Sequence, residues 1–121
     1  MFMHTYRDLI VWQKAIDLSV AVYQLSNSFP REELYGLTSQ IKRSTVSIPA
    51  NIAEGRLRNS NKEFKRFLHI AFGSGGELET HLEIAKKVWV GLDRVQLSKV
   101  EALLAEVMRM LNSLINRSPR A

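Results

Sequence analysis

The chain has 121 residues, of which 45% are hydrophobic and 24% charged, a balance typical of one globular domain with a single core. The absence of cysteine excludes disulfides, thiolate zinc sites and thiol nucleophiles, and no apolar stretch resembles a signal peptide or a membrane span. The formal charge of +5 is compatible with an anionic partner such as nucleic acid. We therefore expect one cytoplasmic domain over residues 1–121, with no cofactor and no membrane partner.

The first predicted helix, residues 8–28, carries apolar side chains on two neighbouring stripes. An outer helix of a monomeric bundle needs an apolar arc of only about 100° or somewhat more, so we expect the excess surface to contact another subunit. The alternative is that Leu9 and Trp12 merely cover a chain end. The first stripe is Val11, Ala15, Leu18, Val22, Leu25 and Phe29, and the second is Leu9, Trp12, Ile16, Ser19 and Tyr23.

A turn is predicted near residues 29–35, because Pro30 breaks the first helix and the following carboxylates suit the start of a new one. The second helix should span residues 36–57. Pro49 falls inside it, where the ring lacks an amide donor and crowds the carbonyl of Thr45, so we expect a kink there. One face of this helix carries Leu37, Ile41, Thr45, Ile48 and Ile52.

The third helix should span residues 61–90, since Ser60 and Glu63 form the Ser-x-x-Glu pattern of a capping box. Glycines at positions 73, 75 and 76 allow a loop instead, because each costs about 1 kcal/mol relative to alanine inside a helix. The apolar register continues across them without a shift in phase, which favours one long helix. Its stripe is Phe64, Leu68, Ala71, Gly75, Leu78, Leu82, Ala85 and Trp89.

The fourth helix should span residues 94–116, with Gly91 ending the third helix and Asp93 capping the fourth. Short connections make sequential helices pack antiparallel, so the fold class is all-α, an up-down-up-down four-helix bundle. The fourth stripe is Leu97, Val100, Leu104, Val107, Leu111 and Leu114, widened by Met108 and Ile115.

Motifs for chemistry are incomplete. Di-iron bundles use Glu-x-x-His pairs on facing helices, whereas Glu77 and His81 lie four residues apart. No Gly-x-Ser-x-Gly elbow accompanies a serine nucleophile, and residues 73–76 lack the lysine that ends a phosphate-binding loop. We therefore expect no catalytic site and no metal site.

Positive charge is concentrated between residues 42 and 66, where Glu54 and Glu63 are the only acidic residues. Residues 62, 65 and 66 share one helix face, so we predict a positive ridge that contacts phosphates. The alternative is a solvated helix face of no specific function. The predicted nucleic-acid contacts are Lys42, Arg43, Arg56, Arg58, Lys62, Lys65 and Arg66.

Several stretches resemble a bacterial family, the four-helix bundle proteins encoded in intervening sequences of 23S rRNA genes. The similarity covers about residues 6–92, and its most specific run is Ser47 to Gly55, Ser-Ile-Pro-Ala-Asn-Ile-Ala-Glu-Gly. Other matching runs are Tyr35 to Arg43, Gly73-Ser74 and Glu77 to Thr80. The resemblance implies a homopentamer with a central channel. More distantly, the chain is similar to accessory proteins of diversity-generating retroelements, which are basic pentamers that associate with nucleic acid and a reverse transcriptase.

No catalytic residues are implied by the resemblance. The expected function is that of a non-enzymatic, oligomeric bundle that associates with RNA or DNA through the basic segment. The alternative is a scaffold that presents helix faces to a protein partner and binds no nucleic acid.

Overall fold

The computed structural model describes residues 5–117, which form an all-α bundle without strands in that range. The predicted four-helix architecture is confirmed. The long helices are α1 (Ile10–Leu25), α2 (Leu37–Leu57), α3 (Asn61–Val88) and α4 (Arg94–Arg117), and the short 3-10 helices are η1 (Tyr6–Asp8), η2 (Ser26–Ser28) and η3 (Arg31–Glu33).

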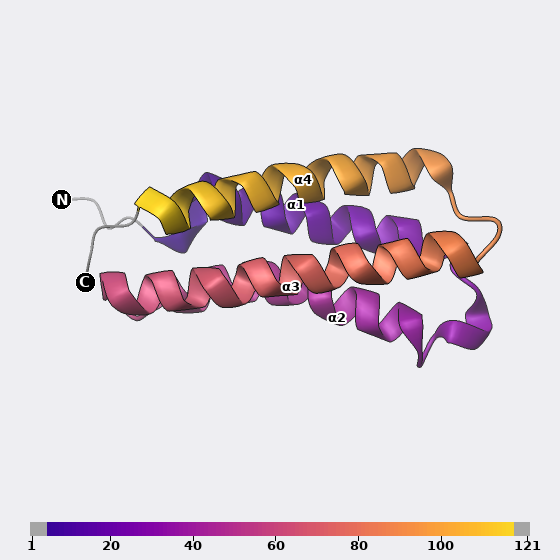
Figure 1. Cartoon of the computed structure of the whole chain (residues 1–121), viewed down its shortest axis with the longest axis horizontal. Coiled ribbons are helices and arrows are strands. Elements are labelled where there is room, and N and C mark those ends of the chain that lie inside the picture. Colours follow the sequence, from indigo (N-terminus) through magenta and orange to yellow (C-terminus); the bar gives the residue numbers. More distant parts are fainter. Residues whose placement is uncertain (1–4, 118–121) are drawn as a thin grey trace.

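Each long helix packs against two others, so the four helices enclose one core. α1 contacts α2 and α4, and α3 contacts the same two helices. Figure 1 shows α1 and α4 along one side of the elongated bundle and α2 and α3 along the other. The turn between α2 and α3 lies at the same end as the start of α1 and the end of α4 (Figure 1).

The predicted apolar stripes form the core with small differences. Every residue of the first α1 stripe is buried, but Leu114 in α4 is only half-buried while Ile115 is buried. Ile115 lies 18 residues after Leu97, which is five full turns at 3.6 residues per turn, so the two side chains point the same way. The stripes also missed Ala21 and Phe67, which are buried.

Side-chain caps hold the predicted helix starts. The Ser60 hydroxyl accepts a hydrogen bond from the Glu63 amide at 3.3 Å, and the Asp93 carboxylate accepts one from the Gln96 amide at 3.1 Å. α3 ends at Val88, two residues before its predicted end, with Trp89 as an extended C-cap. Gly91 therefore does not end the helix but lies in the connection to α4, with φ +83°, a conformation that favours glycine. Glu33 lies in η3 rather than inside α2, and its carboxylate accepts from the first amide of α2 at 3.1 Å.

The glycine run at residues 73–76 lies inside α3, which continues without a break from Asn61 to Val88. The loop alternative is therefore wrong. A side chain at Gly75 would collide with Met108, so this glycine lets α4 approach α3 closely. Gly55 has the same effect between α2 and α3, because its Cβ would lie 2.5 Å from the Cβ of Phe67.

Pro49 lies in the middle of α2, which continues through it as one helix; the kink remains a prediction. Because proline has no N–H, the Thr45 carbonyl loses its usual partner within the helix. The Ser19 hydroxyl of α1 donates to that carbonyl at 3.3 Å. A side chain from the neighbouring helix thus replaces the bond that the proline removes.

None of the helices within residues 5–117 combines the length and the apolar character that crossing a membrane requires.

Candidate nucleic-acid interface at the end of α2 and α3

The structure divides the predicted basic segment into two parts. Lys42 and Arg43 lie in the second turn of α2, and at 1.5 Å per residue they are about 20 Å along the helix from its basic C-terminal end. The other five cations gather around the turn that joins α2 to α3. We call this group the basic corner; it consists of Arg56, Arg58, Lys62, Lys65 and Arg66.

Two arginines of the basic corner converge on one aromatic ring. The guanidinium carbons of Arg58 and Arg66 lie 5.0 Å and 4.5 Å from the centroid of the Phe67 ring. Glu54 accepts from Arg58 at 2.9 Å, and Glu63 accepts two bonds from Arg66 at 3.1 and 3.2 Å. Ring and carboxylates together hold both guanidinium groups in place, which lowers the entropy that they lose on binding an anion.

The Glu63 carboxylate stays ionised at neutral pH. The hydrogen bond from Arg66, followed by the attraction of Arg66, Arg58 and Lys62, holds the pKa of Glu63 below its usual value. The same hydrogen bond raises the pKa of Arg66. Glu54 and Glu63 therefore offset part of the positive charge, and Lys62 and Lys65 make no ion pair with the described residues.

The turn itself contributes a polar groove. Asn59 has φ 56°, and Ser60 then caps the start of α3, so the positive end of the helix dipole faces the same region as the cations. The groove measures about 350 Å³, and its lining includes Arg56 and the half-buried ring of Phe64. The spacing of Phe64 fits the apolar stripe of α3, so the sequence alone predicts a core residue there and gives no sign of the groove.

Lys42 belongs to a different surface from the basic corner. Its ammonium group lies 4.8 Å from the centroid of the Tyr23 ring on α1. Arg43 is exposed beside it in the sequence. Lys42 therefore lies on the side of the bundle formed by α1 and α2, and both predicted contacts are separated along α2 from the other five.

The second apolar stripe of α1 has two different environments. Leu9 and Trp12 are half-buried, and the indole ring packs edge-on against the Tyr6 ring at 5.2 Å. Farther along the stripe, Ile16 is 36% and Tyr23 47% exposed, and Val20 beside the stripe is 53% exposed. A shallow groove of about 550 Å³ runs there between α1 and α2. We call this surface the α1–α2 face; it consists of Ile16, Ser19, Val20, Tyr23 and Val46.

Within residues 5–117, no group of three or more His, Cys, Asp or Glu side chains is placed to hold an ion. His69 is exposed, and His81 is half-buried with its Nδ1 atom unpaired. Both histidines lie on α3.

Comparison with known proteins agrees with this architecture. A family model for the 23S rRNA-intervening sequence protein matches residues 7–113. The crystal structure of a protein of unknown function from the S23 ribosomal protein family of Bacteroides thetaiotaomicron is similar, with a TM-score of 0.76 and 28% sequence identity over 88% of this chain and 98% of that chain. The chain matches no curated protein. The family match includes the basic corner and most of every long helix, so the chain belongs to the 23S rRNA-intervening sequence protein family.

Proposed function

We propose that this chain is a non-catalytic protein that binds the phosphate backbone of RNA or DNA through its basic corner and assembles with copies of itself through the α1–α2 face. The clustering of Arg56, Arg58, Lys62, Lys65 and Arg66 around one turn carries the first part of the proposal. Lysine and arginine neutralise phosphate charge, and these contacts supply most of the non-specific affinity without reading sequence.

The geometry favours backbone binding over the reading of base edges. A helix-turn-helix motif places a second helix across the first, at about 90–120°, so that it enters the major groove. Here α2 and α3 are antiparallel neighbours in a closed bundle, as Figure 1 shows. The cations lie at a helix end, where they reach phosphates while the helix faces remain packed.

Ribosomal RNA is a reasonable first probe because the family description refers to it. That description concerns the location of a gene, and the physical argument concerns phosphate in general. The experiment therefore compares a structured rRNA fragment with a DNA duplex of similar length. Similar affinities for both would support recognition of the backbone.

A pair of matched triple variants tests the basic corner. One carries Lys62→Gln, Lys65→Gln and Arg66→Gln, and the control carries Lys87→Gln, Arg94→Gln and Lys99→Gln at exposed positions near the opposite end. Each triple variant replaces three positively charged side chains by neutral ones, so the net charge falls equally in both. Fluorescence anisotropy between about 50 and 200 mM salt should show that the corner variant loses about two to three units of the slope of log K against log salt.

The control variant should retain most of the affinity and the slope. Equal losses in both variants would show that net charge alone, and not the corner, attracts the nucleic acid. A wild-type protein that binds neither probe at the lowest salt concentration contradicts the proposal.

The alternative is a scaffold for another protein, which the exposed apolar side chains of the α1–α2 face favour. A pull-down after nuclease treatment separates the two functions. Stoichiometric recovery of one protein despite the nuclease supports the scaffold, whereas loss of all bound material supports association through nucleic acid.

A further inference from the structure

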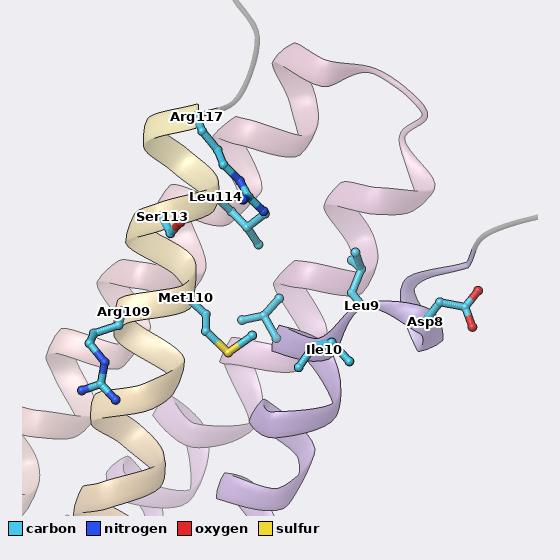
Figure 2. Close-up of a pocket in the computed structure, with 9 residues that line it drawn as sticks. Asp8, Leu9, Ile10, Arg109, Met110, Ser113, Leu114 and Arg117 are labelled. Carbon is cyan, nitrogen blue, oxygen red and sulfur yellow. The ribbon is translucent and has the colours of Figure 1, made fainter.

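A second apolar groove lies between the start of α1 and the end of α4. It measures about 520 Å³, within the range of 300–1,000 Å³ that is typical of small-molecule sites. Figure 2 shows Met110 reaching from α4 toward Ile10 on α1. The apolar side chains that line the groove are Leu9, Ile10, Val11, Met110 and Leu114.

One cation lies over this apolar floor. Arg117 leans from the last turn of α4 past Leu114 toward the space between the helices (Figure 2). It makes no ion pair with another residue of 5–117. Arg109 also borders the groove, but its guanidinium group points away from it, as does the carboxylate of Asp8 (Figure 2). The groove therefore combines an apolar floor with one positive end.

This groove is separate from the α1–α2 face. One turn beyond Ile10, Lys14 forms an ion pair with Glu106 of α4 at 3.5 Å, so that side of α1 faces α4. Ser19, farther along α1, faces α2, where its hydroxyl group donates a hydrogen bond to the Thr45 carbonyl. The groove and the α1–α2 face therefore lie on different sides of α1.

We propose that this groove binds a medium-chain carboxylate, with the hydrocarbon chain along Ile10, Met110 and Leu114 and the carboxylate at Arg117. An unbranched chain buries apolar area against the floor. The guanidinium group of Arg117 donates two parallel hydrogen bonds to a carboxylate, a geometry that a hydroxyl group does not reproduce. Charge at one end and apolar surface along the rest select this ligand over a nucleotide or a sugar.

Binding is tested with decanoate below its micelle-forming concentration, and decanol below its solubility limit is the neutral control. Methyl signals of Ile10, Met110 and Leu114 are followed by NMR on the full chain. Decanoate should shift these signals in a saturable manner and bind about tenfold more tightly than decanol.

Two variants of one helix make the test specific. Arg117→Gln should weaken decanoate binding about tenfold and leave decanol binding unchanged, whereas Arg109→Gln should change neither. An Arg117→Gln variant with unchanged decanoate affinity overturns the proposal, as does a wild type whose groove signals do not shift. Shifts that appear only after dilution dissociates an oligomer also contradict it, because they show that a second copy covers the groove.

Discussion

Pro49 and Ser19 form a pair in which one residue removes a hydrogen bond and the other replaces it. The Thr45 carbonyl is buried in the bundle and accepts from the Ser19 hydroxyl. Leaving a buried acceptor unpaired costs about 1–3 kcal/mol. The pair therefore predicts an interaction that a double-mutant cycle measures.

Ser19→Ala should lower the free energy of unfolding by about 1 kcal/mol or more in the wild type. In a Pro49→Ala background, the backbone N–H of residue 49 is available to donate to the Thr45 carbonyl. Ser19→Ala should then lower the free energy of unfolding by clearly less than in the wild type. Urea unfolding of the four proteins checks this. Equal costs in both backgrounds would show that Ser19 does not compensate for the proline.

Gly55 and Gly73 should respond oppositely to alanine. A Cβ at Gly55 would lie 2.5 Å from the Cβ of Phe67, whereas one at Gly73 meets nothing within 4 Å. Gly55→Ala should therefore destabilise the protein by about 1–3 kcal/mol through overpacking. Gly73→Ala should stabilise it by about 0.5–1 kcal/mol, because alanine is the better helix former.

Thermal unfolding of both variants checks this pair, and each serves as the control for the other. Destabilisation by Gly73→Ala in the isolated chain would contradict the structure. A stable Gly73→Ala variant with altered assembly would instead show that the open side of this glycine meets another copy.

Among the helices, α3 shows what periodicity can predict. Its apolar register crosses residues 73–76 in phase, and α3 does continue through them. The apolar pattern does not explain why residue 75 is a glycine. The explanation is a contact with Met108, which reaches Gly75 from α4, more than 30 residues later in the sequence. Local periodicity predicts the element, whereas contacts between elements explain its composition.

The basic segment shows the limit of the same reasoning. Lys62, Lys65 and Arg66 share one face of α3, which helical spacing alone predicts. The positions of Lys42 and Arg58 depend on the length of α2 and on the ring of Phe67. The segment of residues 42–66 therefore contains more positive charge than the fold brings together at the basic corner.

Glu63 makes the stability of α3 depend on pH. Its pKa is lowered in the folded chain, chiefly by the hydrogen bond from Arg66. The stabilisation by the Glu63–Arg66 pair is therefore fully present above the pKa that Glu63 has in the unfolded chain. It is lost as the pH falls through the lower pKa that Glu63 has in the folded chain. The pair is exposed, so the effect should be small.

Glu63→Gln should therefore reduce the free energy of unfolding slightly near neutral pH and not at all in strong acid. Urea titrations of the wild type and the variant at several pH values measure the difference. A difference that stays constant across the whole pH range would show that the Glu63–Arg66 pair contributes nothing.

Assembly is a property of the whole molecule, and a matched pair of variants tests it. Val20 and Val46 on the α1–α2 face are 53% and 42% exposed, and Val90 and Val95 are 93% and 80% exposed elsewhere. Val20→Glu with Val46→Glu should dissociate the oligomer, because two charges would be buried in the interface. Val90→Glu with Val95→Glu should not.

Light scattering gives the answer directly. The wild type should show a multiple of the 13.8 kDa chain mass, and the resemblance to the family implies five copies. A wild-type mass near that of one chain at low micromolar concentration contradicts assembly.

The bundle as a whole was predictable because its helices are long, strongly periodic and joined by short connections. The surfaces that are free to contact other molecules were less predictable from the sequence. Leu9 and Trp12 were grouped with Ile16 and Tyr23, yet η1 partly covers Trp12 through the Tyr6 ring. A helix stripe does not indicate which part of it the rest of the chain covers.

If the chain assembles into a ring and binds nucleic acid as proposed, the position of the basic corner at one end of the bundle raises the avidity for long polyanions. In a ring with cyclic symmetry every subunit has the same orientation along the axis, so equivalent corners repeat around a single rim. After the first corner engages a long polyanion, each further contact is intramolecular, and overall affinity can rise by about 10²–10⁴ without any new interaction. Corners that are weak individually would then hold a polymer tightly while releasing short oligonucleotides.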